Sequence, residues 1–570
     1  MLTGLLIREL FAAWTGHPWD FEVWVRVGKH VALGGNPYTI LHPDPMLSFS
    51  PFGDMESIGY PPLSAYFFAL GYILYNLTSF NIKYVYYFLL KQPTIISDAL
   101  IGCFLYRYSG NLATLFWIYN PYVILVSSIW GAIDPIAILF TLLALEYSLK
   151  GKRDILVSTL FSLAISIKGL PAIFTPHFLR SSTKSSFSII MKRFIYLIVI
   201  TSMLIVGLFI LHGWPWKGFL ECMSHQASPP TYGGISPLLS LEYVKKDLPP
   251  LMNTMLSLLW IPAVLTSYIK ILRLENNAIK QEIYYLVAVT AGIFIISRPF
   301  VSEPWLLYPI AFMLMRESSF RKARLWMFTA LGLLNLTINN TLLLWFASPL
   351  DKRFFEIAHF WNNNPPYETV RLALRQIAAL LLLQEILALV FNDPPLLSRC
   401  LRKLRSLSNY DLIRYGFFLT TAPVLGFLLD YIVINMITDW KHVLEKGVFM
   451  GLNFLSIYHL LIAMIFFCWI ITIVLNRENS LVKRLKEFLI LTGLLVVISG
   501  CALPIFQLLR GSVVLGGELL ELIGPFKMND IMYFVSTTSI LGVLPAITEL
   551  DTLLPRLRDF LKIGLYKLLE

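Results

Sequence analysis

The chain has 570 residues, of which 56% are hydrophobic and only 14% are charged, and its mean hydropathy is +0.67. Because soluble domains carry about 25% charged residues, this composition excludes a soluble enzyme. The net charge of +11 comes from basic clusters between apolar runs, as in the cytoplasmic loops of membrane proteins, so we expect no nucleic-acid partner. Five widely separated cysteines indicate neither a disulfide framework nor a CxxC metal site.

Apolar runs long enough for membrane helices follow one another along the chain. The first, residues 2–14, is short and carries Arg8 and Glu9, and we interpret it as the outer end of a first helix that is truncated or snorkels. It lacks a small-residue cleavage site, so no cleavable signal peptide is expected. The fold class is therefore all-α, a polytopic transmembrane helical bundle of about 12–14 spans. We predict spans at 84–107, 112–129, 134–149, 194–212, 253–270, 283–298, 304–316, 325–347, 371–392, 412–437, 448–475, 488–509 and 531–549.

Basic clusters orient these spans, because loops rich in Lys and Arg stay in the cytoplasm. The clusters lie at 150–153, 180–193, 270–280, 316–324, 399–405, 483–486 and 556–567. They share one side only if the ambiguous stretch 154–179 enters the membrane and returns, with a break at 168–171, and if 61–79 does not cross. This leaves two large extracytoplasmic loops, at about 16–83 and 213–252. The even spacing of the apolar runs after residue 371 suggests an additional transmembrane module of unknown role, 371–570.

Asp20 is the most informative acid of the first loop, because it follows the first apolar stretch directly and lies between Trp19 and Trp24. A carboxylate at the interface between water and lipid can act as general base for the hydroxyl of a lipid-linked substrate. The alternative is a helix cap or an acid at the end of a loop. Position alone leaves both interpretations open.

A series of motifs, in chain order, resembles the GT-C superfamily of glycosyltransferases, which use polyprenyl-phosphate-linked sugars. The segment 60–66, Tyr-Pro-Pro-Leu-Ser-Ala-Tyr, resembles ER glucosyltransferases that extend lipid-linked oligosaccharides, and Gly35-Asn36-Pro37-Tyr38 resembles the GPI mannosyltransferase and its prokaryotic relatives. The likeness covers about residues 1–350 and implies that this part of the chain is a catalytic transmembrane module. Ala132 stands where many relatives have Gln. The other segments that carry it are 91–98, 120–121, 128–134, 166–171 and 301–307.

The resemblance implies that Asp20 is the catalytic residue, with Glu22 completing a D-x-E pair. Such a pair could hold Mg²⁺ or Mn²⁺ through its oxygen ligands, and catalysis without metal stays an alternative. Three histidines of the first loop, His17, His30 and His42, lack the spacing of zinc ligands.

Chemistry supports a single base, because a polyprenyl phosphate leaves as a stable anion and needs no general acid, unlike the leaving group of a glycoside hydrolase. Direct displacement then inverts the anomeric carbon. The departing phosphate needs cations, and we expect Arg298, Lys91 and Lys168 in this role. The alternatives are that Arg298 pairs with Glu303 and that Lys91 snorkels to the interface.

Four further residues are pocket candidates: Asp98, Asp134, Glu303 and Tyr60. For Asp98 we favour a structural role as partner of an internal polar group. For Asp134 we favour a helix cap over a direct role in catalysis.

Together these features predict a membrane glycosyltransferase. It would move mannose or glucose from a polyprenyl-phosphate donor to a lipid-linked or surface glycan on the extracytoplasmic side. The expected location is a multi-pass position in a prokaryotic plasma membrane or an ER membrane, with membrane lipids around it. The alternative is a transporter or lipid flippase, which would show interrupted helices in two inverted halves, or a non-catalytic subunit of a glycan assembly complex.

Overall fold

The computed structural model describes residues 1–181, 187–227, 229, 231–243, 250–272, 276–316, 319–341, 343–363 and 365–395, and this part of the chain is mostly helical. Contacts divide the chain into two units. The first comprises Met1–Ser236, Pro250–Phe360 and Glu385–Pro395, and the second comprises Pro237–Pro249, Trp361–Gln384 and Leu396–Glu570. The spans predicted between 412 and 549 lie outside the described residues. The two modules expected from the sequence therefore stay a prediction.

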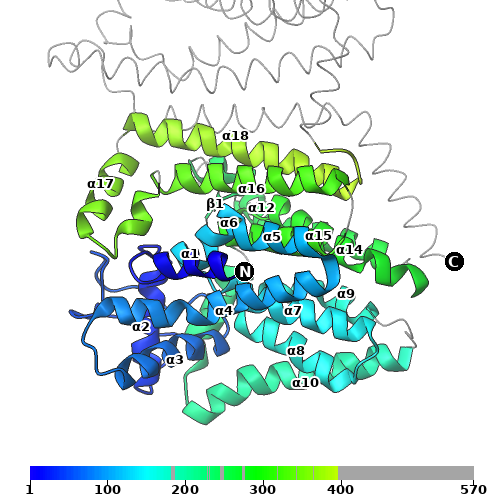
Figure 1. The fold of residues 1–570 in the computed structure, drawn as a ribbon, viewed down its shortest axis with the longest axis horizontal. Coiled ribbons are helices and arrows are strands. Elements are labelled where there is room, and N and C mark those ends of the chain that lie inside the picture. The colour runs from blue at the N-terminus through cyan, green and yellow to red at the C-terminus, as the bar shows by residue number, and fades with distance from the viewer. Residues whose placement is uncertain are drawn as a thin grey trace, which may run out of the picture. The chain divides into compact units, whose positions relative to one another are not determined.

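The first 180 residues form helices of very different lengths (Figure 1). They are α1 (Leu2–Ala12), α2 (Asp20–Ala32), α3 (Leu63–Leu77), α4 (Lys83–Ser109), α5 (Asn111–Tyr119), α6 (Pro121–Ile124), the π-helix η1 (Leu125–Trp130), α7 (Asp134–Leu149), α8 (Asp154–Ile167), the 3₁₀-helix η2 (Leu170–Phe174) and α9 (Thr175–Arg180).

The remaining described chain adds further helices and two very short strands. They are α10 (Phe187–His212), α11 (Trp216–Ala227), β1 (Gly233–Gly234), η3 (Leu239–Tyr243), α12 (Pro250–Leu258), α13 (Trp260–Leu272), α14 (Asn276–Ser297), β2 (Phe300–Val301), η4 (Glu303–Leu306), α15 (Leu307–Leu314), α16 (Ser319–Asn339), η5 (Leu344–Ala347), α17 (Lys352–Asn363) and α18 (Pro365–Val390).

Two of the described helices, α4 and α10, are long and apolar enough to cross a membrane. The run α5–α6–η1 is also long and apolar enough, but its two halves meet at an angle of 47°. If this bent run is counted as one span, the number of candidates is three. The structure thus confirms a helical chain with membrane-spanning candidates at the predicted 84–107 and 194–212. The full count of 12–14 spans stays a prediction.

Two helix breaks, at Asn120 between α5 and α6 and at Lys168 after α8, have local causes. The Asn120 side chain accepts hydrogen bonds from the backbone N–H groups of Tyr122 and Val123, so it ends α5 and caps α6, whose first residue is Pro121. The predicted break at 168–171 is confirmed, because α8 ends at Ile167 and Lys168 has extended backbone angles. Both breaks therefore arise where the sequence has Asn-Pro or Lys-Gly-Leu-Pro.

The predicted first outer loop contains two helices, α2 and α3, which pack on each other and on α4 (Figure 1). Gly28 makes this packing possible, because a Cβ there would lie 2.6 Å from the backbone oxygen of Phe68. The Tyr86 hydroxyl of α4 donates to the Val25 carbonyl of α2 at 2.8 Å, and the Trp24 ring stacks on Phe68. The helix that begins with Asp20 is thus fixed on two neighbours.

The second predicted loop is joined to the segment after α14 by a parallel β1–β2 pair. Gly234 pairs with Val301 and has a φ of +63°, in the left-handed region that favours glycine. A Cβ at Gly234 would overlap the Val301 carbonyl oxygen. This close approach holds the second loop against the segment that carries Arg298.

Candidate functional site around Asp20

Asp20 opens α2 and keeps one third of its side chain exposed. Its Oδ2 accepts a hydrogen bond of 3.1 Å from the Trp130 indole N–H, contributed by the end of η1. An acidic side chain in the first turn of a helix is also stabilised by the partial positive charge of that end. Asp20 therefore combines a fixed orientation with access from outside.

His17 supports the same end of α2. Its Nδ1 accepts hydrogen bonds from the backbone N–H groups of Trp19 and Asp20, at 3.3 and 3.1 Å. The His17 ring stacks on Trp130 with a centroid separation of 4.4 Å. Burial lowers the pKa of His17, although the Asp20 carboxylate opposes this shift. The ring is therefore neutral at pH 7, as an acceptor at Nδ1 requires.

Trp130 ends a π-helix, a rare element that occurs often at functional sites. The next residue, Gly131, has a φ of +90°. A Cβ at Gly131 would lie 3.0 Å both from Cε of Lys91 and from the ring of Phe21. The turn after Trp130 thus needs glycine for its backbone conformation and for its packing.

Glu22 has a different environment from Asp20 and is fully buried. Its Oε1 accepts from Nε of Arg26 at 2.7 Å. Its Oε2 accepts from the backbone N–H groups of Phe49 and Ser50 at 3.0 and 3.4 Å. The Glu22 carboxylate therefore binds the first loop to α2.

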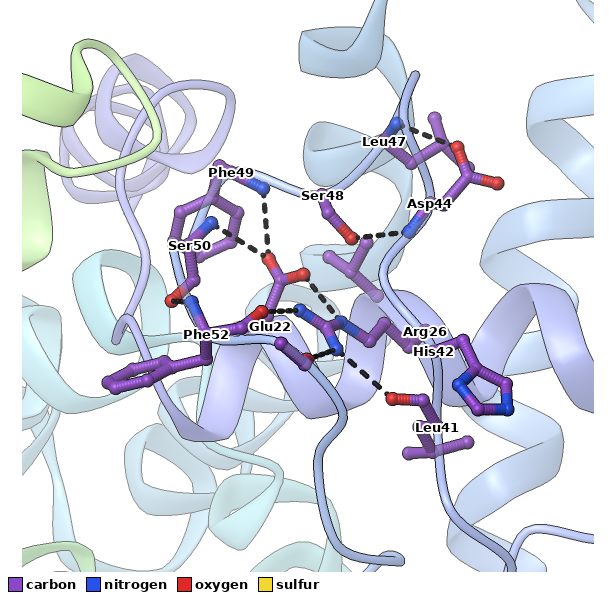
Figure 2. A network of polar contacts seen from close by, with 12 residues as sticks. Glu22, Arg26, Leu41, His42, Asp44, Leu47, Ser48, Phe49, Ser50 and Phe52 are labelled. Carbon is purple, nitrogen blue, oxygen red and sulfur yellow. Dashed lines mark hydrogen bonds and ion pairs between the residues drawn. The ribbon is translucent and has the colours of Figure 1, made fainter.

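Arg26 completes this anchor, as Figure 2 shows. One terminal nitrogen of its guanidinium donates to the carbonyls of Leu41 and Gly53, and the other donates to that of Phe52. The Glu22–Arg26 pair thus satisfies backbone groups from two separate stretches of the loop. We call these residues and their backbone partners the loop anchor.

The residues present do not fit a metal ion shared by Asp20 and Glu22. Both belong to α2, and side chains two positions apart on a helix do not face each other. Both Glu22 oxygens already accept hydrogen bonds within the loop anchor. In addition, the described part of the chain holds no group of three or more His, Cys, Asp or Glu side chains arranged for a metal.

Tyr60, Asp134 and Lys168 lie together near Asp20. The Lys168 ammonium forms an ion pair of 2.5 Å with Oδ2 of Asp134, and both side chains are almost completely buried. The same ammonium lies 5.1 Å from the centre of the Tyr60 ring. Burial, and then the Asp20 and Asp134 carboxylates, raise the pKa of Tyr60 well above its usual value of 10. The Tyr60 hydroxyl therefore stays protonated at neutral pH.

The prediction that Asp134 caps a helix is wrong. Asp134 is the first residue of α7, and Ile133 occupies the cap position with no side-chain hydrogen bond. Its carboxylate instead faces the buried Lys168 ammonium, because a buried charge needs a partner. The second oxygen of Asp134 is buried and has no hydrogen-bond partner among the described residues.

Lys91 is completely buried, so the alternative that it snorkels is wrong. Its ammonium donates to the carbonyls of Thr15 and Ser128, both at 2.7 Å, and makes longer contacts of 3.2 Å with the Ile129 carbonyl and the Thr15 hydroxyl. An ammonium has three hydrogens to donate. These backbone contacts use them, which leaves none for a phosphate.

Asp98 has the structural role that we favoured. Its Oδ2 accepts a hydrogen bond of 2.8 Å from Nε of Arg8, and both side chains are completely buried. Arg8 also donates to the Ile118 carbonyl at 2.7 Å. The ion pair thus fastens α1 to α4 and to the end of α5.

Arg298 lies beside the second loop and donates to the backbone carbonyls of Phe300 and Gln226. The guanidinium is charged at neutral pH, because arginine keeps its proton in proteins. The Gln226 side chain lies near Gly59, because a Cβ on Gly59 would be 3.2 Å from its amide nitrogen. Gly59 precedes Tyr60, so Gln226 lies between Arg298 and the segment that carries Tyr60. The rings around the guanidinium belong to Trp260, Phe294 and Trp305.

The alternative interpretation was that Arg298 pairs with Glu303. Among the described residues, no ion pair joins these two side chains. Its Oε1 accepts from the Asn339 amide at 2.9 Å, and its carbonyl accepts from the Tyr122 hydroxyl at 2.5 Å. Tyr122 also interacts electrostatically with Asp134. Glu303 is therefore a buried polar residue that is linked to Asp134 through Tyr122.

The structure thus brings Asp20, Tyr60, Asp134 and Lys168 together, with Arg298 one segment away. Sequence reasoning missed His17 and Trp130 as the partners of Asp20. A signal was present for each, because His17 precedes Asp20 by three residues and Trp130 lies in the 128–134 motif.

Comparison with models of known protein families finds no match for this chain, and comparison with curated proteins finds none either.

Proposed function

We propose that this protein is a membrane glycosyltransferase of the GT-C type. It moves a hexose, mannose or glucose, from a polyprenyl-phosphate carrier to a lipid-linked or surface glycan on the extracytoplasmic side. The observation that carries the proposal is the contrast between Asp20 and the neighbouring acids. Glu22, Asp98 and Asp134 are buried in ion pairs with Arg26, Arg8 and Lys168. Asp20 is partly exposed and is held by the neutral Trp130 indole and by the first turn of α2.

Such a carboxylate suits a general base. Asp20 takes the proton of the acceptor hydroxyl while that oxygen attacks the anomeric carbon of the donor sugar. The bond between this carbon and the phosphate oxygen breaks at the same time, and the electron pair leaves with the polyprenyl phosphate. The configuration of the anomeric carbon is inverted. No acid is required, because the leaving phosphate is a stable anion.

Lys168 is the cation that we assign to the departing phosphate. Its contact with the Tyr60 ring puts it in the same group of side chains as Asp20, and the Asp134 carboxylate uses only part of its donor capacity. Fixed cations in a water-poor site stabilise charge that develops on a leaving group. Arg298 is a second candidate, because no described contact involves one of its terminal nitrogens. Lys91 is omitted, because its hydrogens serve backbone carbonyls.

The proposal implies a multi-pass protein in a prokaryotic plasma membrane or an ER membrane. The lipid tail of the donor would lie against apolar helices. Exposed apolar side chains of α10, such as Met203, Ile210 and Leu211, fit contact with lipid.

A transfer assay tests the proposal. Full-length protein in detergent is given radiolabelled polyprenyl-phosphate mannose or glucose, with membrane lipid extract as acceptor. We expect wild type to transfer label from one donor and Asp20→Asn to lose at least about 100-fold of this activity. Asp54→Asn is the matched control, because Asp54 lies in the same loop but is exposed and pairs with His42.

Two outcomes would overturn the proposal. Equal transfer by wild type and Asp20→Asn removes Asp20 as the base. No transfer from either donor by folded wild type favours the transporter or accessory-subunit alternative. Retention of activity in EDTA is expected, because Asp20 and Glu22 do not share a metal-binding geometry.

A further inference from the structure

The buried ammonium of Lys91 connects the two segments that hold Asp20. It binds the backbone of Thr15, two residues before His17, and the carbonyls of Ser128 and Ile129, directly before Trp130. These partners lie 76, 37 and 38 residues away from Lys91 in the sequence. One cation therefore fixes the segments of both side chains that contact Asp20.

The carbonyls that Lys91 binds need a donor. Those of Ser128 and Ile129 belong to the last turn of η1, where carbonyls lack partners within the helix. A buried carbonyl without a donor is costly, and a hydrogen bond from a charged group is stronger than a neutral one. Lys91 supplies these donors at the point where Gly131 turns the chain. The direction of the Trp130 side chain thus depends on this contact.

The Lys91 stem is also enclosed, which leaves it little freedom to serve another group. Its ammonium lies 4.6 Å from the centre of the Phe21 ring, and its Cε would touch a Cβ on Gly131. Phe21 follows Asp20 in α2. The cation is therefore packed between the start of α2 and the end of η1.

We propose that Lys91 is a positioning residue for the base. It acts through Trp130 and His17, which it holds at the distances where the indole N–H meets Oδ2 of Asp20 and the imidazole caps α2. This inference rests on the proposed function in assigning the base role to Asp20. It differs from the expectation that Lys91 binds the donor phosphate, and the two ideas make opposite predictions for donor affinity.

Kinetics of three variants test the proposal. Lys91→Met keeps the length of the stem and removes the donors. Trp130→Phe keeps a ring for His17 and removes the N–H. Lys83→Met is the matched control, because Lys83 starts the same helix and its ammonium lies over the ring of the adjacent Tyr84, 5.3 Å from the ring centre. We expect Lys91→Met and Trp130→Phe each to lower kcat by about 10- to 100-fold. In each of these two variants, the KM for the donor and the KM for the acceptor stay within about twofold of wild type, because neither residue touches a substrate.

The double variant separates the two roles of Lys91. If Lys91 acts through Trp130, combining Lys91→Met with Trp130→Phe lowers kcat hardly more than the worse single change. A donor KM raised by Lys91→Met, with effects on kcat/KM that multiply in the double variant, would overturn the proposal in favour of a phosphate ligand.

A structural measurement keeps the proposal testable without activity. In protein labelled with 5-fluorotryptophan, the ¹⁹F signal of Trp130 is identified by its disappearance in Trp130→Phe. We expect this signal to move in Lys91→Met and in Asp20→Asn, and to stay in place in Lys83→Met. An unmoved signal in Lys91→Met refutes the positioning role. If the signal moves but wild type transfers no sugar, the positioning role stands and the proposed function fails.

Discussion

Replacing Glu22 with Gln tests whether this acid serves the loop anchor or the chemistry. The Gln side chain keeps one oxygen and puts an amide NH₂ in place of the other. Because the two Glu22 oxygens face Arg26 on one side and the Phe49 and Ser50 N–H groups on the other, at least one donor then loses its acceptor. The same change leaves the buried Arg26 guanidinium without a counter-charge.

The size of the effect follows from this geometry. Breaking a fully buried ion pair by removing one charge costs about 3–5 kcal/mol. If that cost falls on local opening of the loop, amide exchange there becomes faster by about 100-fold to several thousand-fold. Hydrogen exchange measured by mass spectrometry on peptides that cover residues 36–60 reads this directly. The largest change is expected at Phe49 and Ser50, whose N–H groups bind Glu22.

Glu56→Gln is the control, because Glu56 is an exposed acid of the same loop. It should leave the exchange of these peptides unchanged. The reasoning is refuted if Glu22→Gln also leaves exchange unchanged. Loss of transfer activity without faster exchange would assign Glu22 to the chemistry instead.

Three further predictions concern stability. Arg8→Met leaves the buried Asp98 carboxylate without its cation and should lower the free energy of unfolding by about 3–5 kcal/mol, measured as a lower Tm. Arg8→Met combined with Asp98→Leu should recover much of this loss. For Asp44, burial raises the pKa, but the Lys29 ammonium and backbone N–H groups lower it more, so the net shift is downward. Its stabilisation is thus present above the unfolded value of 3.8 and is lost as pH falls through the lower folded value. Asp44→Asn should lower Tm at pH 7, and a Tm difference that does not shrink as the pH falls below 3.8 would contradict this account. Gly234→Ala should lower Tm by breaking the β1–β2 contact, and Gly53→Ala, which meets open space, should not.

Much of the fold could be predicted from local sequence. The predominantly apolar segments 84–107 and 194–212 each form a helix long and apolar enough to cross a membrane, because the length and hydropathy of a segment are properties of neighbouring residues. The break at Lys168 follows from Gly and Pro in the next three residues, because neither continues a helix well. The helix that begins with Asp20 was not predicted, because the sequence indicated a loop after the first apolar stretch.

The partners of the charged residues required the tertiary structure. Arg8 and Asp98 are 90 residues apart, and Trp130 and Asp20 are 110 apart. A buried charge must find a counter-charge or several hydrogen-bond donors or acceptors, but the sequence does not say which of them packing brings near. Lys91 is an example. From the sequence alone, a lysine in an apolar run could bind a phosphate, extend to the membrane interface or donate hydrogen bonds to backbone carbonyls.

The sequence by itself therefore determined that this chain is apolar and helical, that it has helices long and apolar enough to cross a membrane, where its helices break, and that Asp20 is the acid to examine. Only the tertiary structure decided that Glu22 holds a loop, that Asp98 fastens α1, and that Asp134 pairs with Lys168. The physical reason is range: hydropathy and backbone preference act over a few residues, whereas the pairing of buried charges depends on which helices meet.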